Sequence, residues 1–277
     1  MSSAALRLVL LLPGLAFIAV SFILPLLWLI NISFTTQETQ GATTATYALV
    51  LSDPFYWRLA GNTLWLSAIV AVIAVALSYP LGLFLARTQS RWRGVLATLA
   101  IAPLLTSTVV RTYGWMIILG DQGLINSTLK SIGLTERPIA LANNFTGAVI
   151  ALVEILMPYA ILAIVSGLGR LKPEHEEAAA LHGADRLRVF TRVILPLSLP
   201  AIMTALLLVF VLAISSFVTP RLMGGGRVFV FGTEIFNEST VTLNWPLAAV
   251  LSILLLALFA LVMAIYSRMM RAMEEPA

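Results

Sequence analysis

The chain has 277 residues, of which 60% are hydrophobic and 11% charged, and its mean hydropathy is +0.97. Soluble globular domains are about half apolar and about a quarter charged, so this composition excludes one and indicates an all-α polytopic membrane protein. With no Cys and two His, disulfides, thiolate metal sites and histidine clusters are excluded. The net charge of +4 reflects an uneven distribution of basic residues between loops, so we expect no nucleic-acid partner.

Six apolar segments are long enough to cross about 30 Å of hydrocarbon as helices of roughly 20 residues. They are Leu8–Ile32, Ala60–Ala86, Val95–Leu119, Phe145–Leu168, Leu195–Val218 and Trp245–Tyr266. The first segment follows Arg7 as a secretory signal would, but it is too long and ends without a small-residue cleavage site, so we expect it to be retained. The sequence therefore predicts one transmembrane domain over residues 1–277.

Basic residues outside the spans predict the orientation. If the N-terminus is cytoplasmic, eleven Lys and Arg residues lie inside and five lie outside. The positive-inside rule then places both termini in the cytoplasm. The outer loops, about 33–59, 120–144 and 219–244, are too short for a ligand-binding domain of their own.

Several spans contain residues that are costly in hydrocarbon. Pro103 and Pro158 each free a backbone carbonyl that has to be satisfied inside the protein or by a water-filled route, as do Pro13, Pro25 and Pro80. Arg111 and Glu154 are charged, and an ionised side chain at the bilayer centre costs at least roughly 2.5 kcal/mol. These two side chains either line a substrate route or pair with each other or with the backbone, and both can hold.

Residues 170–194 form the most polar segment of the chain and must lie in water. Pro173 suits a first helical position, and Glu174, Glu176 and Glu177 would meet the positive end of the helix dipole. Gly183 can adopt the left-handed conformation that ends a helix, and Asp185 can cap a second helix. The segment therefore predicts two short helices meeting at a bend, before Pro196 opens the next apolar run.

These residues resemble the EAA loop of bacterial ABC-importer permeases. Glu177-Ala178-Ala179, Gly183 and the run 193–196 match its pattern of EAA, three residues, Gly, nine residues and Ile-x-Leu-Pro, except that Val193 replaces Ile. The resemblance implies a coupling helix that docks into a cytoplasmic ATPase. The coupling residues it implies are Glu176, Glu177, Ala178, Ala179, Leu181, Gly183 and Pro196.

Other segments resemble spermidine/putrescine-type permeases. They are Pro103 with Arg111-Thr-Tyr-Gly114, the run 217–225, and Asn244-Trp-Pro-Leu-Ala-Ala249. The resemblance implies a type I ABC-importer permease with six transmembrane helices in a bacterial inner membrane. Its implied partners are a second permease subunit, an ATPase dimer and an extracytoplasmic binding protein. The substrate-pathway residues that we predict are Arg111, Tyr113, Trp115, Glu154, Tyr159, Phe217 and Arg221.

The residues indicate two different charges for the substrate. Polyamine permeases tend to carry an acidic residue where this chain has Arg221, which repels a polycation, whereas Glu154 favours a cationic or zwitterionic amine. A polyamine is thus the family-level expectation, and a zwitterionic or anionic solute is the alternative.

The chain contains no P-loop, because neither of its lysines follows a glycine. We therefore expect no enzymatic activity, metal or cofactor in this chain, with ATP and Mg²⁺ bound by the partner ATPase. An ion-coupled secondary transporter is the competing class, but it predicts inverted repeats, and none is evident. A non-transporting scaffold would not require charges inside the bundle.

Overall fold

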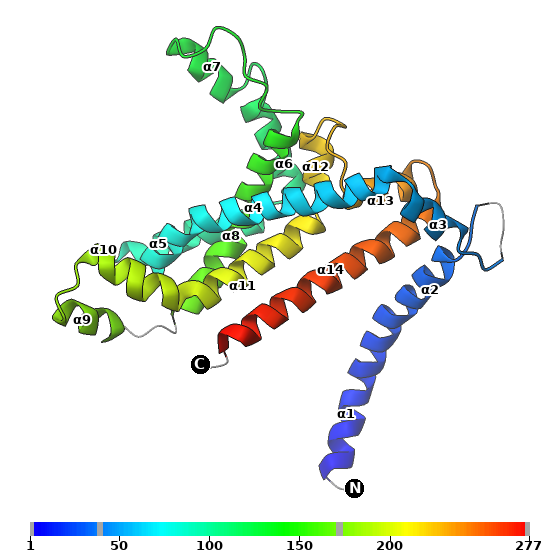
Figure 1. Ribbon diagram of the computed structural model, residues 1–277, viewed down its shortest axis with the longest axis horizontal. Helices are drawn as coiled ribbons and strands as arrows, with labels where there is room; N and C mark the ends of the chain where they lie inside the picture. Colours follow the sequence, from blue (N-terminus) through cyan, green and yellow to red (C-terminus); the bar gives the residue numbers. More distant parts are fainter. Residues whose placement is uncertain (1–2, 38–40, 170–173, 275–277) are drawn as a thin grey trace. The chain divides into compact units, whose positions relative to one another are not determined.

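The computed structural model describes residues 3–37, 41–169 and 174–274, and no strand occurs among them (Figure 1). Nearly all of this part of the chain is helical. In chain order the elements are α1 (Ser3–Ile18), η1 (Ala19–Ile23), α2 (Leu24–Ser33), α3 (Ala45–Ser52), α4 (Pro54–Arg87), α5 (Trp92–Ile101), η2 (Ala102–Leu105), α6 (Thr108–Leu119), α7 (Leu124–Ser131), α8 (Phe145–Leu168), α9 (Glu174–Leu181), α10 (Arg186–Val189), η3 (Phe190–Ile194), α11 (Leu195–Ile214), α12 (Val218–Met223), α13 (Phe231–Thr240) and α14 (Trp245–Glu274).

Five of the described helical segments are long and apolar enough to cross a membrane, and a bent helix pair brings the number to six if it counts as one span. These segments agree with the six predicted from hydropathy. All of them satisfy their backbone groups as helices, which is the condition for crossing hydrocarbon. The predicted boundaries agree at the fourth span, Phe145–Leu168, and differ at the other five; the first and second spans are Leu11–Ser33 and Pro54–Arg87 instead of Leu8–Ile32 and Ala60–Ala86.

The third span is not the single helix predicted for Val95–Leu119. Its two parts, 92–105 and 108–131, meet at an angle of 101°. Pro103 lies in the 3₁₀ turn η2, and Thr106 is extended with ψ of 146°. Pro103 cannot donate a helical hydrogen bond, and the Thr106 hydroxyl and N–H both bind the Pro103 carbonyl, at 2.7 and 3.1 Å. The backbone therefore turns here instead of continuing as a helix.

The fifth and sixth spans also differ from their predicted limits. The helix that was expected to begin at Leu195 is continuous from Arg186 and ends at Ile214 instead of Val218. Ser215 and Ser216 follow, and their hydroxyls bind the carbonyl of Leu212, at 3.2 and 3.0 Å, which competes with further helical hydrogen bonds. The sixth helix extends past Tyr266 to Glu274.

Two π-helical turns each precede a proline. The turn η1 lies just before Pro25, and η3 lies just before Pro196. A proline ring clashes with the carbonyl four residues earlier, and widening the preceding turn relieves that clash. This is why Pro196, predicted to mark the entry to the next apolar run, interrupts no helix.

The chain forms two compact units, which we describe separately. The first consists of Met1–Arg58 and Glu234–Leu261. In it the Tyr47 hydroxyl donates to the Ser33 hydroxyl at 2.8 Å, and the Tyr47 and Phe34 rings are 5.3 Å apart. The first span, Leu11–Ser33, has an 18-residue window with none of its residues buried, so its apolar side chains are exposed.

The second unit consists of Leu59–Thr233 and Val262–Ala277, and its core is formed by α4, α8 and α11. The span of α8 has 61% of its apolar window buried, more than any other span described. Small residues permit close approach: a Cβ on Gly82 would lie 2.6 Å from Ile164, and one on Gly167 would lie 2.3 Å from the Ala201 Cβ. The helices therefore pack backbone to backbone, as small residues allow in membranes.

We expect Gly167→Ala to destabilise the unit by about 1–3 kcal/mol, because the new methyl overpacks the contact between α8 and α11. Gly61→Ala is the matched control, since nothing lies within 4 Å of its Cβ position and alanine favours a helix. Thermal unfolding in detergent, followed by tryptophan fluorescence, measures both. Equal midpoints for the two variants would contradict the close approach.

Candidate functional site

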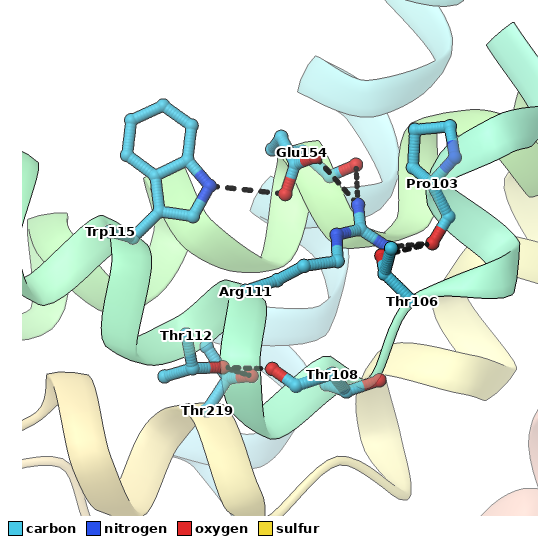
Figure 2. Close-up of polar contacts among 8 residues, drawn as sticks. All are labelled: Pro103, Thr106, Thr108, Arg111, Thr112, Trp115, Glu154 and Thr219. Atoms are coloured by element: carbon cyan, nitrogen blue, oxygen red, sulfur yellow. Dashed lines mark hydrogen bonds and ion pairs between the residues drawn. The ribbon is translucent and has the colours of Figure 1, made fainter. Parts of the chain in front are cut away.

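A cluster of polar groups lies where the broken third span meets α8. It consists of Arg111 and Trp115 of α6, Glu154 of α8 and the carbonyl of Pro103, and we call it the Arg111 cluster (Figure 2). Arg111 and Trp115 are one helical turn apart and therefore share a face of α6. The structure thus brings together three of the residues that the sequence predicted for the pathway.

Hydrogen bonds join every member of the cluster. The Arg111 Nη2 donates to the Glu154 Oε1 at 2.6 Å and to the Glu154 carbonyl at 3.0 Å, and Nη1 donates to the Pro103 carbonyl at 3.2 Å. The Trp115 Nε1 donates to Glu154 Oε2 at 3.0 Å. The Arg111 side chain is 12% exposed and that of Glu154 is 34% exposed. Each Glu154 carboxylate oxygen therefore has a donor, while the group keeps partial access to its surroundings.

The cluster also provides hydrogen-bond donors to two backbone carbonyls that lie at or near prolines. Pro158 lies four residues after Glu154 and cannot donate to its carbonyl, and Arg111 supplies the missing donor. At the break in the third span, the same guanidinium binds the Pro103 carbonyl. The predicted pairing of Arg111 with Glu154 and with backbone groups is therefore confirmed.

The remaining predicted pathway residues lie outside this cluster. Tyr113 on α6 is 51% exposed. Tyr159 on α8 is partly buried and packs against the hydrophobic core. Phe217 precedes α12 as its N-cap residue, and Arg221 lies on α12, exposed.

The helix α12 is connected to α6 through a pair of buried hydroxyls. The side chains of Thr112 and Thr219 are 3.0 Å apart, and Thr112 also donates to the Thr108 carbonyl at 2.8 Å (Figure 2). The sequence analysis did not select these threonines, since a threonine in an apolar helix has no local signal that names its partner.

The polar loop contains the short helix α9 that the sequence predicted, whereas the predicted second short helix, α10, is the first part of the long helix that continues to Ile214. Acidic residues occupy the first turn of α9, Gly183 adopts the left-handed conformation with φ of +80°, and Asp185 Oδ1 accepts a hydrogen bond from the Arg188 N–H at 2.8 Å. Arg170, Lys172 and Pro173, which were included in this loop, lie outside the described residues. The bend predicted at Gly183 is therefore confirmed.

The residues predicted for coupling lie mostly on the surface of α9. Glu177 and Ala178 are exposed, Ala179 is partly exposed, and Leu181 is 87% exposed. Glu176 is only partly exposed, because it forms an ion pair with Arg87 at the end of α4. Pro196 lies exposed in the first turn of α11.

Two carboxyl groups on α13, in the first unit, were missed by the sequence analysis. Burial, the charge of Glu238 and a hydrogen bond with it raise the pKa of Glu234. The Thr242 hydroxyl donates to Glu238 Oε2 at 2.6 Å. The two glutamates are spaced i, i+4 on one helix, and this like-charge spacing was the signal that could have revealed them.

The polar groups of the Arg111 cluster and of α9 can bind, orient and hold charge. Together with the spans, they indicate which class of protein this is. Helices cross the membrane around an internal ion pair, and an exposed helical element projects from them. In the described ranges no group of three or more His, Cys, Asp or Glu residues is placed to hold a metal ion. The arrangement is that of a polytopic membrane protein that moves a solute or supports its movement.

Residues 78–275 match the family model of the binding-protein-dependent transport system inner membrane component, so the chain belongs to that family. It is 31% identical to the spermidine/putrescine transport system permease protein PotB of Haemophilus influenzae, over 89% of this chain and 87% of that protein. Identity to PotB of Escherichia coli K12 is also 31%, over 91% and 93%. The crystal structure of a bacterial ABC transporter that imports alginate matches with a TM-score of 0.82, 17% identity and coverage of 98% and 96%.

Membership confirms the predicted class and fold. The chain is a permease subunit of an ABC importer, with the type I permease fold, and is not an enzyme. It belongs to an inner membrane. An ion-coupled secondary transporter, the competing class, does not fit this family.

We expect Arg111→Gln to destabilise the protein by about 1–3 kcal/mol, because it removes the charged donor of Glu154 Oε1 and the donor of the part-buried Glu154 carbonyl. Glu154→Gln should cost less, since the glutamine oxygen and the backbone carbonyl still accept from Arg111. Tyr113→Phe, exposed on the same helix, is the control and should stay within about 0.5 kcal/mol. Thermal unfolding of the three variants compares them, and a larger loss in Glu154→Gln would contradict the cluster's role at the backbone.

Proposed function

We propose that this permease subunit moves a polyamine of the spermidine or putrescine type into the cytoplasm. The observation that carries the proposal is the similarity to two spermidine/putrescine permeases along nearly the whole chain. A membrane-embedded carboxylate, Glu154, is consistent with a cationic solute. The solute would come from an extracytoplasmic binding protein.

The proposed orientation places both termini in the cytoplasm. The excess of Lys and Arg on that side supports it, and so does the polar surface of α9, which requires water. α9 would then be a coupling helix that docks into a cleft of the ATPase through Glu177, Ala178 and Leu181. ATP and Mg²⁺ would be bound by an ATPase dimer, and this chain would bind no cofactor of its own.

A second permease subunit would complete the route. The exposed apolar surface of the first span supports this, because no residue in its 18-residue apolar window is buried. Alternating access then means that the ATPase and the loaded binding protein each favour one of two conformations of the permease pair.

The Arg111 cluster would take part in that change. Its ion pair fixes the broken third span against α8, and relative movement of these helices would separate Arg111 from Glu154. A cationic solute could then replace the guanidinium at the carboxylate, since both present N–H donors. Thus the structural and pathway interpretations of the two charges describe two states of one site.

An anionic or zwitterionic solute is the second candidate. The observation that favours it is Arg221, exposed on α12 where the resembling polyamine permeases tend to carry an acidic residue. Its positive charge would repel a polycation and attract a carboxylate.

We expect the reconstituted complex, with its own binding protein, to hydrolyse ATP faster when spermidine or putrescine is added, by about tenfold at saturation. Amino-acid-like zwitterions and small anions are the matched additions, with ATPase rate as the readout. Stimulation by an anion or zwitterion alone would overturn the polyamine proposal and leave the importer class intact.

We expect Gly183→Val to reduce stimulated ATP hydrolysis several-fold, because a β-branched residue is strained at φ of +80° and would move α9. Gly183→Asn is the matched variant: asparagine tolerates this conformation, and nothing lies within 4 Å of the Cβ position. It should keep most of the stimulation. Normal stimulation in Gly183→Val would contradict the coupling role of the bend.

A further inference from the structure

The helix α9 is attached to the rest of its unit at both ends. At its C-terminal end it continues through Gly183 into α10, and it packs against α10 and η3. In its first turn, Glu176 Oε1 forms an ion pair with Nη2 of Arg87. Arg87 is the last residue of α4, so this contact joins the predicted coupling helix directly to the second span.

The C-terminal part of α4 is itself firmly held. The Ser78 hydroxyl donates to the Met157 carbonyl at 3.3 Å, and Ile164 packs against Gly82 at a distance that leaves no space for a Cβ. Leu85, one turn from the end, is 3% exposed. A displacement of Arg87 therefore moves α4 against α8, the most buried span described.

Two simpler explanations exist for a basic residue at position 87, but neither accounts for its contact with Glu176. Arg87 interacts favourably with the C-terminal dipole of α4, and it follows the positive-inside distribution. Neither effect requires a carboxylate partner on a helix that is distant in the sequence. The ion pair is therefore an additional feature of the tertiary structure.

The exposure of the pair indicates that it sets position more than stability. The side chains of Arg87 and Glu176 are 24% and 28% exposed, although the Glu176 Oε1 atom of the pair is itself buried, and partly exposed ion pairs contribute little to folding. At the other end of α9, Gly183 has φ of +80°, and nothing lies within 4 Å of its Cβ position. A second attachment in the first turn removes the freedom of α9 to pivot there.

We propose that Arg87 is a positioning residue for coupling: its ion pair with Glu176 fixes the orientation of α9 and transmits the movement of α9 to α4. The inference rests on the proposed function of α9 as the ATPase-docking helix. Without the pair, α9 still docks, but its movement reaches the spans through α10 and η3 alone. ATP hydrolysis then responds less to the loaded binding protein.

The test uses the whole complex in proteoliposomes. The variants are Arg87→Glu, Glu176→Arg, their double charge reversal and the milder Glu176→Gln. Arg91→Glu and Glu174→Arg are the matched controls, because they reverse neighbouring charges in the same cytoplasmic region. The readouts are the ATPase rate with loaded binding protein divided by the rate without it, the solute transported per ATP, and the amount of ATPase that co-purifies.

Each single variant of the pair should lower the stimulation ratio by about fivefold, with co-purification unchanged in Glu176→Gln. The double reversal should restore most of the ratio, which a general loss of structure would not do. Both controls should keep the wild-type ratio. The proposal is overturned if Glu176→Gln keeps the wild-type ratio, or if the double reversal is as impaired as the single variants.

Failure of the inference can be distinguished from failure of the proposed function. A wild-type complex that does not respond to any loaded binding protein overturns the function itself, before any variant is compared. A wild-type complex that responds normally, together with pair variants that also respond normally, overturns only the role of Arg87.

Discussion

The hydrogen bonds of one guanidinium group hold together the least regular part of this membrane protein. Hydrocarbon offers no partner to a free carbonyl, so every break in a spanning helix needs an internal donor. Arg111 provides donors to the Pro103 carbonyl, at the break of the third span, and to the Glu154 carbonyl, which Pro158 leaves free. The Glu154 carboxylate balances its charge. Arg111 thus supports both the bend of the third span and the proline within α8.

A second ion pair, between Arg87 and Glu176, lies on the proposed cytoplasmic side. The two pairs are similarly exposed: the side chains of Arg111 and Glu154 are 12% and 34% exposed, and those of Arg87 and Glu176 are 24% and 28% exposed. They differ in what they join, because Arg111 also donates to two backbone carbonyls, whereas Arg87 and Glu176 connect the long helix α4 with the short helix α9. The Arg111–Glu154 pair joins α6 to α8, and the Arg87–Glu176 pair joins α4 to α9. They therefore bear on the two processes that a permease must connect, the opening of a route and the response to an ATPase.

Much of the fold could be predicted from the sequence, whereas the candidate site could be predicted only in part. The lengths of the apolar runs predicted the spans, and Gly183 with Asp185 predicted the bend between α9 and α10, because these signals are local. The two charges in spans indicated an interior site, and their pairing was one of two alternatives. The sequence predicted neither the pairing of Arg87 with Glu176, nor the contact between the Thr112 and Thr219 hydroxyls, nor the carboxyl pair Glu234 and Glu238.

The sequence by itself determined the class of this protein, because hydrophobic length, positive charge in particular loops and the EAA-like spacing are properties of contiguous residues. Only the tertiary structure decided that the third span bends by 101° and that the helix beginning at Arg186 continues through Pro196 into the fifth span. Whether a proline interrupts a helix depends on which groups elsewhere satisfy the freed carbonyl. At Pro158 that group is Arg111, which donates to the Glu154 carbonyl, and at Pro196 a π-helical turn precedes the ring instead, a difference that no local pattern specifies.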